Sequence, residues 1–234
     1  MQDTNLIAYD LRMCLIEGKR HFDFLNIYRG IQFVSETVLE SVLEDRAIFS
    51  VQSPSAVLLE RDKASIVLSN GLIDPFAVRV DSFDMDTGRL VIADMAYVGD
   101  TVGNRHEHRL EVTPALPVDI DLEGVPITAE LVDISLSGAG LHLPAFVSEF
   151  SLQHGRRAWL TLHLPEGNVH ILGEFLRFRK IFNHYWAAAK FTGVSAGKNL
   201  ILHYINRRLN EVRLEVQQMY TEARQAKILP RDEE

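Results

Sequence analysis

Residues 129–143 read Ala-Glu-Leu-Val-Asp-Ile-Ser-Leu-Ser-Gly-Ala-Gly-Leu-His-Leu, a polar turn between two apolar runs. The runs, Ala129–Val132 and Ala139–Leu143, are short and stop at the turn, which is typical of two adjacent β-strands. The turn from Asp133 to Gly138 combines side chains that hydrogen-bond to nearby backbone with a glycine that permits positive φ and close approach. This stretch predicts a β-hairpin, and with it a fold that is mainly β.

Other short β-rich runs lie on both sides of this hairpin. They are Leu110–Val112, Val118–Ile120, Ile127–Val132, Ala158–Leu164, Val169–Phe178 and Tyr185–Phe191. Strands at this spacing predict a small antiparallel β-barrel.

A separate β-rich series occupies the N-terminal half of the chain. Its runs are Ala47–Val51, Ala56–Leu59, Ala64–Leu68, Phe76–Val80 and Leu90–Ile92, with Pro, Gly, Asn and Asp between them. This series predicts a second barrel-like or sandwich-like domain. The two series differ in spacing and motif, so they are not sequence repeats.

Helices are expected near both ends of the chain. Between Tyr28 and Arg46 the apolar residues Ile31, Val34 and Val38 recur at helical spacing, which predicts an amphipathic helix. Residues 198–227 contain neither proline nor glycine, and they predict a long helix with one apolar seam. The seam comprises Ile205, Leu209, Val212, Val216, Met219, Ala223 and Ala226. It is interpreted as packing along the helix's own barrel, with self-association as the alternative.

A connector without periodicity, residues 96–104, contains two glycines and places a domain boundary near residue 100. The predicted organisation is an unassigned segment, an N-terminal barrel-like or sandwich-like domain, a linker, a β-barrel, and a C-terminal helix with its tail. Their ranges are 1–30, 31–98, 99–109, 110–195 and 196–234.

Composition excludes several classes of function. The chain has 234 residues and a formal net charge of −8, which argues against wrapping of long nucleic acid. The single cysteine, Cys14, excludes internal disulfides and Cys-rich zinc sites and fits a reducing compartment. With no recognisable signal peptide and no apolar run of about 18 residues, a cytoplasmic protein without membrane insertion is expected.

Two arginines stand at the end of the connector, Arg105 and Arg109 in Asn104-Arg105-His106-Glu107-His108-Arg109. In isolation they would be interpreted as solvated surface side chains. His106 and His108 have no evident third ligand, so no metal site is predicted.

The arginine pair and the turn together resemble the two-part motif of the PilZ domain, Arg-x-x-x-Arg followed by Asp-x-Ser-x-x-Gly. The sequences 173–177 (Gly-Glu-Phe-Leu-Arg) and 189–191 (Ala-Lys-Phe) are similar to two later strands of that family. This resemblance covers roughly residues 103–210. The stretch 90–94 (Leu-Val-Ile-Ala-Asp), which ends the first β-rich series, is similar to the split-barrel domain that precedes PilZ in flagellar brake proteins.

The resemblance implies a receptor for cyclic di-GMP with no cofactor of its own. It implies that Arg105 and Arg109 bind the guanine and phosphate groups of the ligand. It also implies that Asp133, Ser135 and Gly138 line the opposite side of the binding site. Arginine forks suit phosphate and the O6 and N7 atoms of guanine. Asn104 stands where some relatives have another arginine, so one ligand per site is expected.

The expected output is a change in interdomain arrangement that regulates a partner protein in motility, biofilm formation or exopolysaccharide control. Flagellar motor components are the partners that the resemblance implies, and a homo-oligomer through the C-terminal helix is a further hypothesis. Two alternatives stay open: a PilZ-type interaction module that works without ligand, and a nucleotide enzyme such as a phosphodiesterase. The second is disfavoured because no acid, base and metal constellation is visible.

Overall fold

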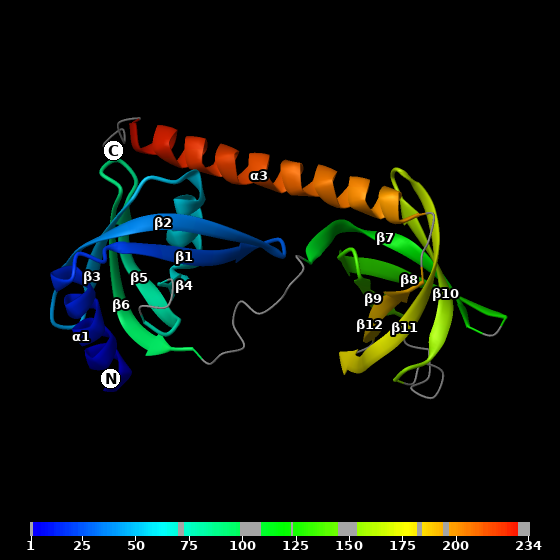
Figure 1. Cartoon of the computed structure of the whole chain (residues 1–234). Coiled ribbons are helices and arrows are strands. Elements are labelled where there is room, and N and C mark those ends of the chain that lie inside the picture. The colour runs from blue at the N-terminus through cyan, green and yellow to red at the C-terminus, as the bar shows by residue number, and fades with distance from the viewer. Residues whose placement is uncertain are drawn as a thin grey trace. The chain divides into compact units, whose positions relative to one another are not determined.

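The structure is a computed structural model that describes residues 2–69, 73–98, 109–122, 124–144, 154–181, 184–193 and 197–228 (Figure 1). The chain forms two compact units, each built on a closed six-stranded barrel. Described residues of 1–28, 32–105 and 212–234 belong to the first unit, and those of 29–31 and 106–211 to the second. The prediction of a mainly β fold with two barrels and flanking helices is confirmed.

The first barrel has the strand order β1-β2-β3-β6-β5-β4. The bounds are β1 (His21–Tyr28), β2 (Ile31–Val42), β3 (Ala47–Val51), β4 (Ala64–Leu68), β5 (Phe76–Asp84) and β6 (Arg89–Tyr97). Three aromatic rings pack together in its interior, with Phe22 and Phe24 each edge-on to Phe49 at centroid distances of 5.7 and 5.0 Å. Such edge-to-face packing stabilises a core beyond the area that it buries.

The helix predicted between Tyr28 and Arg46 is wrong, because this segment forms strand β2. Along β2 alternate side chains point into the barrel, and two of these, Ser35 and Thr37, are polar. The apolar residues alone therefore do not show the period of two that marks a strand. Both hydroxyls have partners inside: Ser35 Oγ lies 2.8 Å from Ser55 Oγ, and Thr37 Oγ1 donates to the carbonyl of Phe22 at 2.9 Å. These hydrogen bonds offset the cost of burying the hydroxyls.

The apolar run expected as a strand at Ala56–Leu59 is also not a strand. It falls in a short 3₁₀ turn, η1 (Pro54–Ala56), and in helix α2 (Val57–Asp62). Val57, Leu58 and Leu59 are all buried, and a short run that is apolar throughout cannot be distinguished from a buried strand by periodicity.

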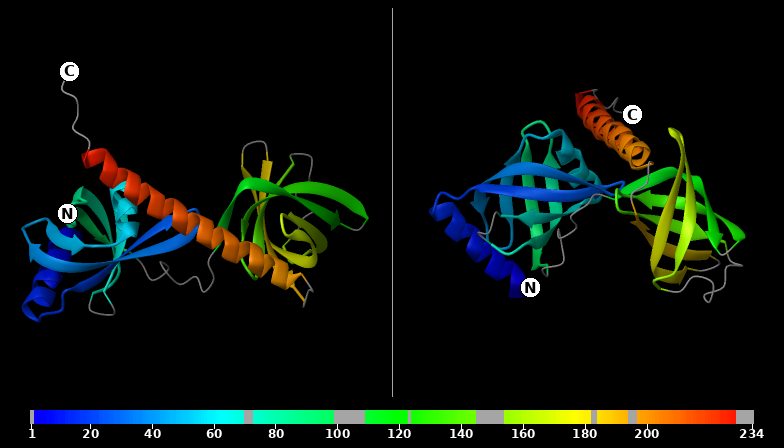
Figure 2. Two further views of the ribbon diagram at one scale, coloured as in Figure 1. Left: turned by 90° about the horizontal axis from the view of Figure 1, so that it is seen from above. Right: turned by 45° about the vertical axis from the view of Figure 1, so that its right-hand side comes forward.

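Helix α1 (Gln2–Ile16) lies on the outside of the first barrel, as both views in Figure 2 show. Ile7, Leu11 and Cys14 enter the core of that barrel. Two hydrogen bonds tie the helix to β6: Thr4 Oγ1 donates to the carbonyl of Met95 at 2.9 Å, and Tyr97 donates its hydroxyl hydrogen to Asp10 at 2.6 Å. The segment left unassigned by the sequence thus contributes to the first core.

The second barrel has the order β10-β11-β12-β9-β8-β7. The bounds are β7 (Leu110–Leu122), β8 (Val125–Ile134), β9 (Gly138–Leu143), β10 (Arg157–Leu164), β11 (Gly167–Ile181) and β12 (His184–Thr192). All six pairings in this barrel are antiparallel. The hairpin predicted from residues 129–143 is the β8–β9 pair, so that prediction is confirmed.

The last helix, α3 (Lys198–Ile228), has 31 residues, and they are divided between the two units. Within the second unit, Ile201, Tyr204 and Ile205 are buried, and Arg207 pairs with Glu166 at 2.7 Å. Within the first, Val216 belongs to the core cluster, and residues Met219, Tyr220 and Ala223 pack against it. These residues therefore pack within their own chain. In the described part of the chain, no helix is long and apolar enough to cross a membrane.

Candidate functional site

Arg109 and Asp133 meet because of the register between two strands. In the β7–β8 pair, Glu111 lies opposite Asp133 and Leu110 opposite Ile134, so Arg109 stands at the end of β8. Arg109 Nη1 is 3.4 Å from Asp133 Oδ1, and the two side chains are 37% and 25% exposed. The two parts of the sequence motif are therefore adjacent in space at this pair. Arg105 lies outside the described residues, as do His106 and His108.

Ser135 shapes the turn between β8 and β9. Its N–H donates to the carbonyl of Gly138 at 2.8 Å, and its hydroxyl oxygen lies 3.4 Å from the same carbonyl. The residue is only 2% exposed. From the next strand, the N–H of Phe191 donates to the carbonyl of Ser137 at 2.7 Å and holds the turn against β12. The corner is thus fixed by hydrogen bonds before any ligand arrives.

Gly138 is required here for space and not for an unusual φ. Gly138 does not have the positive φ that a glycine permits. The expected close approach is present, because a Cβ at this position would lie 2.5 Å from the carbonyl oxygen of Ala189. Any side chain at residue 138 would therefore push β9 away from β12.

Gly140 is a site residue that the sequence reasoning missed. It lies opposite Asp133 in the β8–β9 ladder, and a Cβ on it would overlap the carboxylate oxygen Oδ2 of Asp133. The absence of a side chain makes the space that the Asp133 carboxylate occupies. The available signal was the second glycine of Gly138-Ala139-Gly140, two residues on and hence on the same face of a strand.

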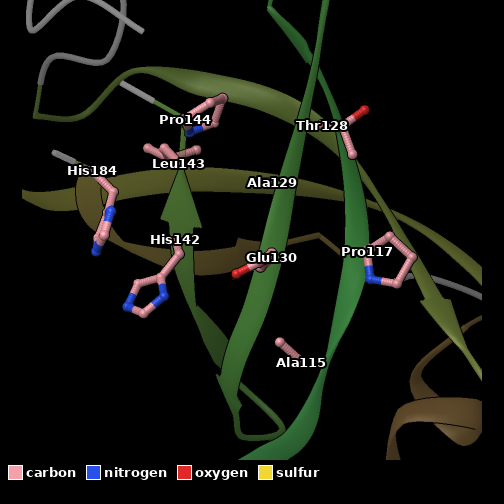
Figure 3. Close-up of a pocket in the computed structure, with 9 residues that line it drawn as sticks. All are labelled: Ala115, Pro117, Thr128, Ala129, Glu130, His142, Leu143, Pro144 and His184. Carbon is pink, nitrogen blue, oxygen red and sulfur yellow. The ribbon is translucent and has the colours of Figure 1, made fainter. Parts of the chain in front are cut away.

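A pocket of about 520 Å³ lies along the same two strands (Figure 3). It is lined by Ala115, Pro117, Thr128, Ala129, Glu130, His142, Leu143, Pro144 and His184. His142 follows Gly140 by two residues on β9 and so shares its face. The rings of His142 and His184 are 5.8 Å apart between centroids, and both border one side of the pocket in Figure 3. Its volume is in the range of small-molecule sites.

Lys190 places a second cation beside the corner. It is exposed on β12 and lies opposite Gly138 in the β9–β12 pair. Directly opposed residues of an antiparallel pair share a face, and Gly138 has no side chain to cover that position. With Arg109, the corner has two cationic groups for an anionic ligand. In the described residues, no group of three or more His, Cys, Asp or Glu side chains could hold a metal ion.

Comparison with known proteins gives one family match. Residues 103–207 match the PilZ domain. No curated protein matches the chain.

Several solved structures are similar to the chain. YcgR from Escherichia coli in complex with c-di-GMP is 16% identical, with a TM-score of 0.44, over 92% of this chain and 94% of that one. The inhibitor of motility MotI (DgrA) from Bacillus subtilis is 14% identical, with a TM-score of 0.42, over 82% and 97%. The MrkH–c-di-GMP complex from K. pneumonia is 15% identical, with a TM-score of 0.41, over 90% and 96%.

Proposed function

We propose that the protein is a receptor that binds cyclic di-GMP at the corner between β8 and β9, since residues 103–207 match the PilZ domain. Proteins with this domain are ligand-binding receptors and effectors and are generally not enzymes. The observation that carries the proposal is the pairing of Arg109 with Asp133, which unites the two halves of the motif at one point of the second barrel.

The chemistry of the corner suits the two phosphates and two guanines of this ligand. Arg109, together with Arg105 four residues before it, donates a pair of hydrogen bonds to a phosphate or to guanine O6 and N7. When Arg109 rotates toward the ligand, its ion pair with Asp133 breaks. The Asp133 carboxylate then accepts hydrogen bonds from N1 and N2 of a guanine. Gly140 leaves room for the Asp133 carboxylate, Gly138 lets β9 lie close to β12, and Ser135 holds the turn.

The ligand is larger than the corner alone. The adjoining pocket of about 520 Å³ gives room for the part of cyclic di-GMP that extends beyond Asp133 along the face of β9. His142 and His184 border this pocket and offer flat rings against which a guanine stacks. This placement has one ligand per site.

The output in this proposal is a change in interdomain arrangement. Residues 99–109 act as the linker; Arg109 at its end already contacts Asp133 of the second barrel, and binding draws Arg105 to the same site. The ligand shifts the arrangement only by its differential affinity for the two states, so a micromolar site limits the switch to about 8 kcal/mol. The new arrangement regulates a partner protein in motility, biofilm formation or exopolysaccharide control, with flagellar motor components as the first candidates.

Isothermal titration calorimetry of the purified chain with cyclic di-GMP tests the site. Wild type should bind, and Arg109→Ala and Arg105→Ala should each weaken binding by about 2 kcal/mol, or roughly 30-fold. Arg157→Ala, which removes an arginine from an exposed ion pair with Glu174 on the same barrel, is the control and should bind as wild type. No heat of binding in wild type would contradict the receptor proposal and favour a PilZ-type interaction module that works without ligand.

Small-angle scattering tests the output. The scattering profile of wild type should change when cyclic di-GMP is added, and that of Arg109→Ala should not change at the same nucleotide concentration. Identical wild-type profiles would leave a receptor without the rearrangement. A pull-down from a lysate with and without the nucleotide then tests whether a partner is captured in a ligand-dependent way.

A further inference from the structure

Helix α1 carries apolar residues on two opposite sides. Ile7, Leu11 and Cys14 face the first barrel and are buried. Leu15 is partly buried against the same core. Four other large apolar side chains form an exposed row, the outer α1 stripe: Leu6, Tyr9, Met13 and Ile16, which are 54%, 59%, 38% and 77% exposed. At 3.6 residues per turn, the centre of this row lies about half a turn from the centre of the buried row. The stripe therefore points away from the first barrel.

The spacing of the stripe is that of a coiled-coil seam. Steps of three, four and three residues place Leu6 and Met13 at one heptad position and Tyr9 and Ile16 at the other. A single exposed apolar side chain is ordinary on a protein surface, whereas a row of four along one helix is a candidate interaction surface.

The charges beside the stripe indicate what covers it. Arg12 lies on one flank and Asp10 on the other. Glu17 is the first residue after the helix, and its N–H donates to the carbonyl of Met13 at 3.0 Å, so it continues the flank of Asp10. In a parallel coiled coil Arg12 occupies a g position, and Asp10 and Glu17 occupy e positions. A g residue of one chain meets the e residue that is five places further along the other chain. Arg12 of one copy then faces Glu17 of the other, twice per pair. An anionic membrane surface is a poor match, because it requires lysine or arginine along the polar face.

We propose that the outer α1 stripe is the interface for a second copy of this chain, with the two α1 helices parallel about a two-fold axis. Arg12 now donates to the carbonyl of Leu43 at 2.6 Å, and Glu17 pairs with Lys19 at 2.7 Å. Both contacts are solvent-exposed and are exchanged at little cost. The pairing does not depend on nucleotide and is independent of the proposed receptor function.

The size of the stripe sets the strength of the dimer. Four half-exposed side chains per copy correspond to roughly 1,000 Å² removed from water by the pair, near the lower end of specific interfaces. The helix is already formed on the barrel, so association carries no cost of folding it. A dimer that dissociates in the micromolar range is expected.

Sedimentation velocity of the full chain without nucleotide, over about 1 to 200 µM, tests the interface. The weight-average mass should rise with concentration from that of one chain toward that of two. Tyr9→Lys should remain monomeric across the range. Val125→Lys is the matched control, because Val125 is also 59% exposed but lies on the second barrel, and it should associate as wild type. A concentration-independent monomer mass, or an unchanged dimer in Tyr9→Lys, overturns the proposal.

A charge exchange tests the parallel orientation. Arg12→Glu should weaken the dimer at least several-fold, because it places two carboxylates together at each flank. Arg12→Glu combined with Glu17→Arg should restore it, since the pair is rebuilt with its signs reversed. Thermal melting of each variant at low concentration should match wild type, as the side chains replaced are on the surface. Failure of the double variant to regain the dimer overturns this pairing of the two copies.

Discussion

The guanidinium of Arg109 lies 3.4 Å from the carboxylate of Asp133, although the residues are 24 positions apart in the chain. Strand register and not local sequence brings them together, since Glu111 and Asp133 are opposite one another in the β7–β8 ladder. Both side chains keep part of their surface in solvent. Such a pair contributes little to stability, so it is well suited to exchange partners with a ligand.

Asp133→Ala should separate ligand binding from stability. Binding of cyclic di-GMP should fall about tenfold, because a guanine loses its acceptor, whereas the free energy of unfolding should change by less than about 1 kcal/mol. Calorimetry and urea denaturation measure the two effects. Glu174→Ala, which breaks a comparable exposed ion pair with Arg157 at 3.3 Å, should leave binding intact. Equal loss of binding in both variants would count against a specific role for Asp133.

Two glycines of β9 should respond differently to the same substitution. Gly140→Ala should lower ligand affinity about tenfold with a small loss of stability, because the new methyl group displaces a side-chain carboxylate. Gly138→Ala should lower stability by about 1 to 3 kcal/mol, because its methyl group meets the fixed carbonyl of Ala189. Thermal unfolding and calorimetry on both variants distinguish the two, and Gly140→Ala with wild-type affinity would remove this residue from the site.

Lys190 should add to affinity through its charge. Lys190→Ala should weaken cyclic di-GMP binding several-fold at low salt, and the difference from wild type should shrink as salt is raised. Lys180→Ala is the control: this lysine lies toward the end of β11 with its ammonium 5.9 Å from the Tyr185 ring centroid, and its loss should leave affinity unchanged. A salt-independent loss in Lys190→Ala would point to altered packing in place of attraction to phosphate.

His163 should make the second barrel slightly more stable in mildly acidic solution. Its Nε2 lies 2.7 Å from Asp119 Oδ2, and the hydrogen bond to Asp119, followed by that to Asn168, raises the pKa of the imidazole above its usual value. A raised pKa contributes stability that is fully present below the unfolded-state value of about 6.5 and is lost as pH rises through the folded-state value. The pKa of Asp119 is lowered by the same pair, so its share is lost in acid.

The measurement is the melting temperature of wild type minus that of His163→Gln between about pH 5 and 9. The difference should be largest near the acidic end and should decline toward alkaline pH. It should be small, since the side chains of His163 and Asp119 are both partly in solvent, which screens the pair. Nuclear magnetic resonance titration of His163 checks the direction independently, and a pKa below that of a free histidine would contradict the prediction.

The corner of the site could be predicted because its residues are close in sequence and chemically distinctive. A polar turn between two apolar runs predicts the β8–β9 hairpin, and the hairpin contains Asp133, Ser135 and Gly138. Gly140 was not predicted as a site residue, because its role depends on which residue lies opposite it in the β8–β9 ladder. Lys190 escaped as a candidate cation for the same reason, since only the barrel pairs it with Gly138.

The N-terminal half was harder to predict because its patterns are mixed. In β2 two inward-facing positions are Ser35 and Thr37, so the apolar residues left a spacing that resembles a helix. In α1 apolar residues such as Leu6 and Ile7 occupy both faces, which removes the contrast that marks an amphipathic helix. In both cases the surroundings of the element, and not its own periodicity, decide what each side chain does.

Helix α3 is shared between the units, and this has a consequence for the order of events during synthesis. The first barrel's core includes Val216, which the ribosome adds only after every strand of the second barrel. While the second barrel is translated, the apolar side chains of the first barrel that pack against Val216 therefore remain uncovered. A stalled or prematurely terminated chain would present those side chains to chaperones and proteases, so quality control should act most strongly on the half of the protein that emerges first.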